Sequence, residues 1–309
     1  MPVAIPELLA LVRNSVSSGH SKRIYEKAVV DFLLWVRGSG EATFGKAAVQ
    51  RYRSELVARG LAASTVNQKM SAIRKLANEM ADNNWLPREA AAAIGNIRGV
   101  EGSGRRTGRW LTVSQTEALL NAPDASTLKG LRDRALLAVL IGSGIRRGEA
   151  AALCFEDIQE RESRWVIVDL RGKRSRIRSI PIAAWTKMSV DAWRSAAGLC
   201  EGRVFRAVDK ADKISGEGLT AQAIYEIVHS YGAVIGGNLA PHDLRRTFAR
   251  LAHKGRAALD QIQLSLGHAS LTTTERYLGV RLDLQDAPCD HLGVRLGCDE
   301  RLLQSAASQ

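Results

Sequence analysis

Long apolar stretches are missing from this chain of 309 residues. Crossing a bilayer as a helix takes about 20 consecutive apolar residues, and no run in the sequence approaches that length. The first residues, MPVAIPELLALVRNSV, also lack the basic start, apolar centre and small-residue cleavage site of a secretory signal. We therefore expect a soluble cytoplasmic protein without a membrane-spanning segment.

Cysteine is scarce as well, with four widely separated residues, Cys154, Cys200, Cys289 and Cys298. Such spacing does not indicate a disulfide framework, so we expect the thiols to be reduced. Cys289, His291 and Cys298 lie near one another but lack the paired C-x-x-C spacing of a structural zinc site. The sequence therefore predicts no metal site.

Acidic residues are outnumbered by basic ones, 32 Asp and Glu against 44 Lys and Arg, which gives a formal net charge of +12. An excess of this size favours a polyanionic partner, either nucleic acid or an anionic membrane surface. A basic protein without any such partner would show the same balance. The net charge alone therefore does not identify the partner, and sequence motifs are needed to choose between these possibilities.

The first hundred residues have the pattern of helices. Apolar residues recur at steps of three and four along residues 64–82, the spacing of one helix face. The opposite face carries Lys69, Arg74 and Lys75, which are either DNA contacts or a solvated surface. We predict a helical DNA-binding domain over residues 1–98.

Residues 99–109, GVEGSGRRTGR, hold four glycines and no periodic apolar pattern. This composition predicts a linker between two domains. Arg105 and Arg106 lie within it and could follow a phosphate backbone, gaining affinity through counterion release. The alternative is that these two arginines serve solubility alone.

A larger α+β domain is predicted over residues 110–285. Ser114 begins an S-x-x-E sequence, which is typical of the capping box at a helix start. Two β-rich runs, 164–170 and 176–182, are joined by a short basic segment and predict a hairpin, in which Arg174 is a candidate DNA contact. The fold class is therefore mainly α with a small β-sheet.

Arginine recurs in two motifs of this second domain. Arg146, in GSGIRRGE, lies at a predicted helix start three residues before Glu149, so the carboxylate could orient the guanidinium. PHDLRRTF places His242 and Arg245 three residues apart on a helix that would begin at Pro241. The planar, permanently charged guanidinium suits the oxygens of a phosphate. Each motif alone is equally compatible with a surface ion pair or a helix cap.

Tyr277 follows His268 by nine residues in the run LGHASLTTTERYLG. A tyrosine hydroxyl has a pKa of about 10, so it needs help to lose its proton before it can attack a phosphodiester. The run places a candidate nucleophile near a candidate helper. By itself the spacing is common, and the histidine is as well explained as a helix cap.

Taken in order, these residues resemble the tyrosine recombinase (phage integrase) family. That family combines an R-x-x-E box, a hairpin lysine, an H-x-x-R motif, an L-G-H motif and a tyrosine nine residues later. The matching positions here are Arg146, Glu149, Lys173, His242, Arg245, His268 and Tyr277. The resemblance implies a helical, SAM-like core-binding domain followed by a catalytic domain.

The resemblance also implies a role for each of these residues. Tyr277 would attack the scissile phosphate, while Arg146 and Arg245 neutralise its oxygens. Lys173 would protonate the leaving 5′-oxygen, and His242 would assist proton transfer at the tyrosine. The histidine of the L-G-H motif would hydrogen-bond a non-bridging oxygen, and the glutamate would support the site. No metal, nucleotide or other cofactor would take part.

Members of the family act as tetramers on two DNA sites. The resemblance therefore implies double-stranded DNA with inverted-repeat sites, a homotetramer, and a sister recombinase or accessory proteins as further partners, with no membrane. The tail at residues 286–309 is either a contact between subunits or a frayed terminus. Two alternative functions are left open, a type IB topoisomerase and a non-catalytic DNA-binding regulator.

Overall fold

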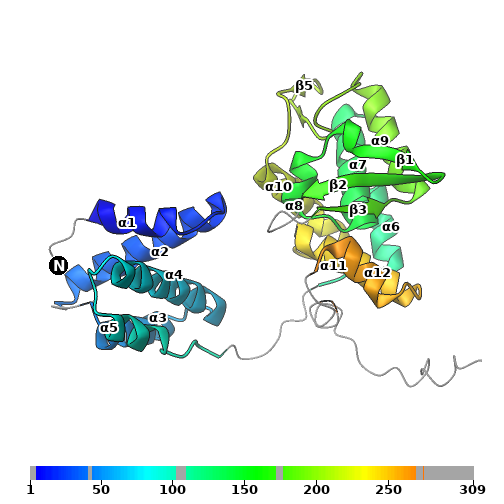
Figure 1. The fold of residues 1–309 in the computed structure, drawn as a ribbon. Coiled ribbons are helices and arrows are strands. Elements are labelled where there is room, and N and C mark those ends of the chain that lie inside the picture. The colour runs from blue at the N-terminus through cyan, green and yellow to red at the C-terminus, as the bar shows by residue number, and fades with distance from the viewer. Residues whose placement is uncertain (1–4, 41–43, 102–108, 172–176, 269–273, 275–309) are drawn as a thin grey trace, which may run out of the picture. The chain divides into compact units, whose positions relative to one another are not determined.

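The computed structural model describes residues 5–40, 44–101, 109–171, 177–268 and residue 274. The chain divides into two compact units, Met1–Arg106 and Thr107–Gln309, which are described separately below as the N-terminal and C-terminal units (Figure 1). Five candidate catalytic or DNA-contact residues lie outside the described residues: Arg105, Arg106, Lys173, Arg174 and Tyr277. Cys289, His291, Cys298 and the tail at residues 286–309 lie outside them as well.

The described part of the N-terminal unit is helical, as the apolar periodicity predicts. Its helices are α1 (Ile5–Asn14), α2 (Gly19–Gly38), α3 (Lys46–Ala58), α4 (Ala63–Asp82) and α5 (Arg88–Gly95). The predicted stripe of α4 is buried, with Val66, Met70 and Ile73 fully inaccessible to solvent. Aromatic rings complete this core, where Phe32 meets Tyr52 edge-on with ring centroids 5.1 Å apart.

Both described ends of the predicted linker are bound to their own unit. On the N-terminal side, Asn67 exchanges two hydrogen bonds with the backbone of Val100, at 2.8 and 2.9 Å. On the C-terminal side, Arg109 donates to the carbonyl of Ile235 at 2.5 Å, and the Leu111 amide donates to the Thr247 hydroxyl at 3.0 Å. Arg109 thus serves as a structural anchor.

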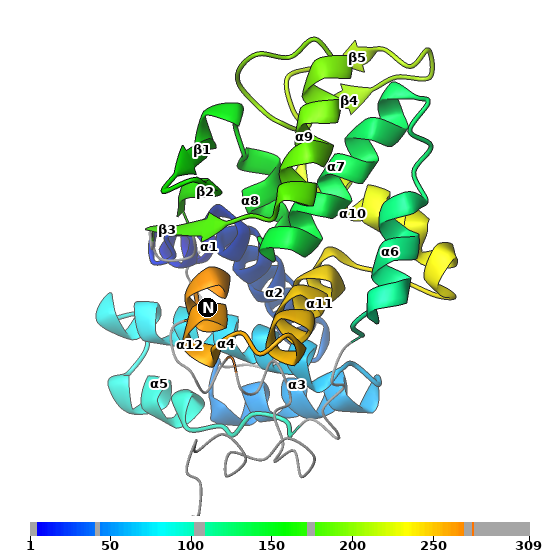
Figure 2. The same cartoon turned by 90° about the vertical axis from the view of Figure 1, so that its right-hand side faces the viewer.

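The C-terminal unit is built around the apolar helix α7. Its elements follow one another along the chain as α6 (Val113–Asn121), α7 (Leu128–Ser143), α8 (Arg147–Ala152), η1 (Phe155–Asp157), β1 (Ile158–Arg161), β2 (Arg164–Arg171), β3 (Ile177–Pro181), α9 (Ala184–Ala196), β4 (Ala207–Val208), β5 (Ile214–Ser215), α10 (Ala221–Ser230), η3 (Tyr231–Ile235), α11 (Pro241–Lys254) and α12 (Leu259–Leu266). Helices α9 and α11 pack against α7, and Figure 2 shows α11 and α12 together at one end of the unit.

The predicted hairpin is present as strands β2 and β3, and β1 extends it to an antiparallel sheet in the order β1-β2-β3. Ile167 and Leu170 of β2 and Ile180 of β3 face the core. The register shifts between Ile167 and Leu170, a bulge that accommodates Asp169 at φ 52°. One face of the sheet therefore packs on the core. Strand β3 also contacts helix α12.

One predicted helix start is wrong by two residues. The cap of α6 is Thr112, whose hydroxyl accepts from the Gln115 amide at 3.2 Å, while the Gln115 side chain accepts from the Thr112 amide at 3.0 Å. Glutamine closes this capping box as well as glutamate does, so the box at Ser114 is not used. Within the described residues, no helix combines the length and hydropathy needed to cross a membrane.

Candidate active site

A left-handed turn delivers Arg146 to the site. Helix α7 ends at Gly144, which has a φ of 62°, a conformation that glycine adopts without strain. A Cβ at this position would also lie 2.5 Å from the Phe248 ring. The chain then turns so that Arg146 becomes the N-cap residue of α8, which agrees with the helix start predicted at this residue.

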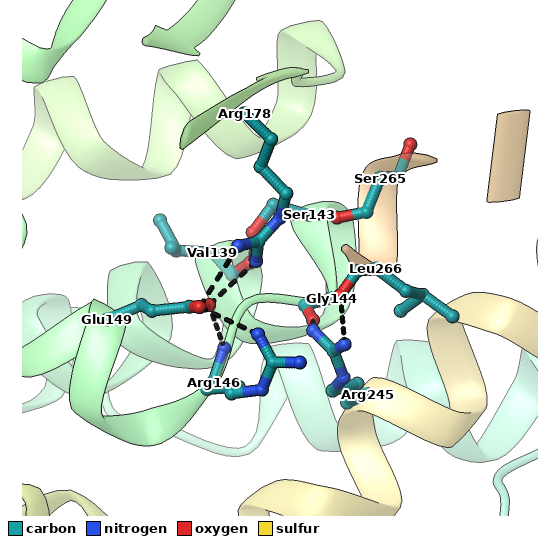
Figure 3. A network of polar contacts seen from close by, with 9 residues as sticks. All are labelled: Val139, Ser143, Gly144, Arg146, Glu149, Arg178, Arg245, Ser265 and Leu266. Atoms are coloured by element: carbon teal, nitrogen blue, oxygen red, sulfur yellow. Dashed lines mark hydrogen bonds and ion pairs between the residues drawn. The ribbon is translucent and has the colours of Figure 1, made fainter. Parts of the chain in front are cut away.

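Glu149 is the centre of a hydrogen-bond network (Figure 3). Its carboxylate accepts from the Arg146 amide at 2.7 Å and from Arg146 Nη1 at 2.9 Å, the pairing predicted from their spacing. It also accepts from Arg178 Nη1 at 3.0 Å and from Arg178 Nη2 at 2.8 Å. Arg178 was not assigned a role from the sequence, although its place on the same strand face as the apolar Ile180 and Ile182 is a signal for an inward-pointing side chain.

The ionisation of Glu149 follows from these contacts. Burial alone would raise the pKa of this carboxyl, since its side chain is only 7% exposed. The hydrogen bonds and charges of Arg178 and Arg146 outweigh that effect, so the pKa is lowered. Glu149 is therefore a carboxylate that holds two guanidinium groups and accepts no proton at neutral pH.

Arg245 joins two segments that are distant in the sequence. It lies on α11, one turn after Pro241, and is only 2% exposed. Its Nη1 donates to the carbonyl of Gly144 at 2.6 Å, and its Nη2 donates to the carbonyl of Leu266. The turn before Arg146 and the end of α12 are therefore held to the same guanidinium, as Figure 3 shows.

The protein lowers the pKa of both predicted site histidines, His242 and His268, and so favours their neutral forms. His268 follows the left-handed Gly267 that ends α12, and its Nδ1 lies 3.0 Å from the Thr274 hydroxyl. Burial, with Arg245 and Arg146 nearby, lowers the pKa of His268 to about 4. Partial desolvation, with Arg246 and Arg245, also lowers the pKa of His242, although its side chain remains exposed.

The site carries an excess of positive charge. The side chains drawn in Figure 3 include three guanidinium groups, those of Arg146, Arg178 and Arg245, and one carboxylate, that of Glu149, which leaves a formal surplus of two positive charges. Neutral histidines add hydrogen-bonding groups without further charge. This arrangement suits an anion with several oxygens, such as a phosphodiester. Within the described residues, no group of three or more His, Cys, Asp or Glu comes together that could hold a metal ion.

Comparison with known proteins shows to which family the chain belongs. The model of the phage integrase family matches residues 109–282, more than half of the chain. The chain belongs to the phage integrase family. A second model, of the N-terminal SAM-like domain of phage integrases, matches residues 8–83. The chain therefore carries the two kinds of domain that its motifs and helical first half predict.

Curated relatives agree with that assignment, and solved structures share the fold. The chain is 26% identical to the tyrosine recombinase XerC of Thermodesulfovibrio yellowstonii, over 86% of this chain and 87% of the relative. It is 30% identical to XerD of Xanthomonas axonopodis pv. citri, over 67% and 77%. A structure of the XerH site-specific recombinase bound to difH substrate shares the fold at 19% identity, with a TM-score of 0.65 over 99% of this chain and 85% of that one. The protein is thus a tyrosine-type, site-specific DNA recombinase, and neither a topoisomerase nor a non-catalytic regulator is favoured.

Each DNA-contact candidate on α4 has a partner within the N-terminal unit. Lys69 pairs with Asp31 at 2.5 Å, and Arg74 donates to the carbonyl of Ile97. Lys75 pairs with Glu79 at 2.9 Å, one helical turn further on. Their assignment as DNA contacts stays a prediction, and for Lys69 and Arg74 a DNA phosphate would have to compete with these partners.

The lowered pKa of His268 gives an expected pH dependence of stability. The ring takes up its proton near pH 6.5 in the unfolded chain but only near pH 4 in the folded recombinase. Because the unfolded state binds more protons in this window, the free energy of unfolding falls as the pH falls from about 6.5 to about 4. We expect His268→Gln to flatten this part of the curve, measured by urea denaturation at several pH values. An equally steep curve for the variant would contradict the assignment, and comparison with wild type removes the overlapping contribution of His242.

Proposed function

We propose that this recombinase cuts and rejoins DNA through a covalent 3′-phosphotyrosyl bond at Tyr277. The observation that carries the proposal is the positive cluster around Glu149, with the turn to His268 beside it and Tyr277 nine residues further along. The tyrosine oxygen forms a bond to phosphorus, the bond from phosphorus to the 5′-oxygen breaks, and the leaving oxygen takes up a proton. The reverse reaction with a new 5′-hydroxyl rejoins the strand.

Arg146 and Arg245 neutralise the phosphate oxygens in this scheme. Arg146 donates to Glu149 through Nη1 and is 38% exposed, so the remainder of its fork is accessible to a phosphate. Arg245 is held by two backbone carbonyls, which orient its plane before DNA binds. Preorganised donors of this kind contribute several kcal/mol each to a transition state in which negative charge develops.

The remaining groups move or share protons. The neutral ring of His268 contacts a non-bridging oxygen, and His242 assists the loss of the tyrosine proton. Lys173, whose place in the sequence is between β2 and β3, supplies the proton for the leaving 5′-oxygen. The energy of the broken bond is kept in the phosphotyrosine, so the reaction consumes no nucleotide and uses no metal ion.

The proposed assembly is a homotetramer on two inverted-repeat DNA sites, with exchange through a Holliday junction. Support comes from related proteins: XerH has been seen with difH substrate, and the Tn1549 transposon integrase with circular intermediate DNA, at 15% identity and a TM-score of 0.64 over 93% of this chain and 99% of that one. Residues 286–309 would contact the neighbouring subunit. A sister recombinase or accessory proteins would join where the DNA sites require them.

The test is to trap the covalent intermediate on a nicked suicide substrate that contains the inverted repeats next to the gene. We expect an adduct that forms in EDTA without added nucleotide, and peptide mapping that places the DNA on Tyr277. A strict magnesium requirement for cleavage, or an adduct on another residue, would refute the scheme. A plasmid without the repeats is the control, and its relaxation would point to topoisomerase activity instead.

A further inference from the structure

We propose that Arg178 is a positioning residue, which sets the geometry of Arg146 through Glu149. The inference rests on the proposed function, because it assigns Arg146 to the scissile phosphate. Arg178 is the second residue of β3, five residues after Lys173 in the sequence. It lies on the inward face of this strand, two residues before the buried Ile180.

The guanidinium of Arg178 donates hydrogen bonds to one carboxylate and one backbone carbonyl of the protein. Its Nη1 and Nη2 donate to the two oxygens of Glu149 at 3.0 and 2.8 Å, a bidentate pair with the geometry of strong guanidinium–carboxylate contacts. Its Nε donates to the carbonyl of Ser265 at 2.9 Å. The side chain is only 10% exposed. Because all three guanidinium nitrogens of Arg178 have protein acceptors, we assign this residue to holding other protein groups and not to the phosphate.

These contacts place Arg178 between three segments of the site. Glu149 belongs to α8, Ser265 belongs to α12, and β3 supplies the arginine (Figure 3). The turn at Gly267 packs directly on it, since a Cβ on that glycine would lie 3.0 Å from Arg178 Cδ. One side chain thus supports both the carboxylate that holds Arg146 and the turn that precedes His268.

Arg146 and Arg178 share the Glu149 carboxylate, but the Arg146 side chain is 38% exposed and the Arg178 side chain only 10%. Arg146 contacts Glu149 through one nitrogen of its fork, whereas Arg178 contacts it through two. Without Arg178, the buried carboxylate would lack most of its compensation and would draw Arg146 into a fuller pairing. Arg146 would then be displaced from the phosphate, and a displacement of about 1 Å reduces a reaction rate about 100-fold.

A double-mutant cycle on the cleavage rate tests this inference. Arg178→Met, Glu149→Gln and the double variant are compared with wild type in single-turnover cleavage of the suicide substrate, with the dissociation constant for DNA measured separately. We expect Arg178→Met to lose about 100-fold in rate and less than about threefold in affinity. Because Arg178 acts through Glu149, we expect the double variant to be no slower than the slower single variant.

Three further variants complete the test: two distinguish a positioning role from a general structural role, and the third checks the covalent mechanism. Arg178→Lys keeps the charge without the bidentate geometry, folds if Arg178→Met does not, and is expected to be about tenfold slower than wild type. Arg164→Met removes the same charge from the exposed far end of the sheet and is expected to cleave at the wild-type rate. Tyr277→Phe shows whether adduct formation depends on the tyrosine at all.

The outcomes separate the two proposals. Losses that multiply in the double variant, or a wild-type rate for both Arg178 variants, would overturn the positioning role while leaving the covalent mechanism intact. An adduct that persists in Tyr277→Phe would overturn the proposed mechanism and this inference with it. Slow cleavage by the Arg178 variants, non-multiplicative with Glu149→Gln and with unchanged DNA affinity, supports the inference.

Discussion

Tyr277→Phe is expected to form no covalent adduct with DNA and to lose at least about 10⁴-fold in cleavage rate. The substitution removes only the oxygen that would bond to phosphorus, and loss of a covalent nucleophile has effects of this size or larger. Denaturing gels of the suicide-substrate reaction measure the adduct directly. Because the substitution keeps the aromatic ring and changes no charged residue, DNA affinity is expected to change by less than about threefold.

The matched control is Tyr225→Phe. Tyr225 stacks on His229 at 5.7 Å, and the guanidinium of Arg147 lies 5.8 Å from its ring centre, so the phenylalanine ring preserves both contacts. We expect this variant to form adduct at the wild-type rate. Adduct formation by Tyr277→Phe, or its loss from Tyr225→Phe alone, would show that the nucleophile is assigned to the wrong tyrosine.

Arg245→Met is expected to reduce the cleavage rate about 10³-fold and to destabilise the fold as well. Removing one preorganised donor from a developing negative charge costs a factor of about 10²–10³, and Arg245 contributes a full charge in addition. Its removal also leaves the carbonyls of Gly144 and Leu266 without this partner, at a cost of about 1–3 kcal/mol for a buried acceptor left unsatisfied. Urea denaturation and single-turnover cleavage measure the two effects separately.

Arg250→Met is the matched control on the same helix. Arg250 lies 4.4 Å from the ring centre of Trp110, five residues beyond Arg245 and with no role in the proposed site. We expect cleavage within about threefold of wild type and a loss of stability of about 1 kcal/mol or less, the usual size of a partly exposed cation–π contact. Equal effects of the two substitutions on cleavage would argue against a specific role for Arg245.

Local motifs explain how much of the site could be predicted from the sequence. Arg146 and Glu149 are three residues apart at the start of one helix, so helix geometry alone brings the carboxylate back to the arginine. Pro241 likewise places Arg245 on the second turn of α11. The two β-rich runs at residues 164–170 and 176–182, joined by a short basic segment, predicted the hairpin in the same way. These relations depend on neighbours in the chain, which a sequence displays directly.

Contacts between distant residues required the tertiary structure. Arg178 and Glu149 are 29 residues apart, and Arg245 is 101 residues from Gly144. Lys69 looked like a surface cation on the polar face of a helix, but Asp31, 38 residues earlier, pairs with it. In each case the partner lies far away in the sequence, and only the packing of the helices and the sheet brings the two residues together.

The sequence by itself determined which chemistry this recombinase carries: the order of its arginines, histidines and Tyr277, the helical first half, and the hairpin. Local hydrogen bonding and the periodicity of helices and strands are properties of short segments, so they can be followed residue by residue. The tertiary structure alone decided how the charges are shared. It placed Arg178 and Arg146 on one carboxylate, buried Arg245 between two carbonyls and lowered the pKa of His268 to about 4. Burial and the proximity of like charges are created by packing, and no single segment of the chain contains them.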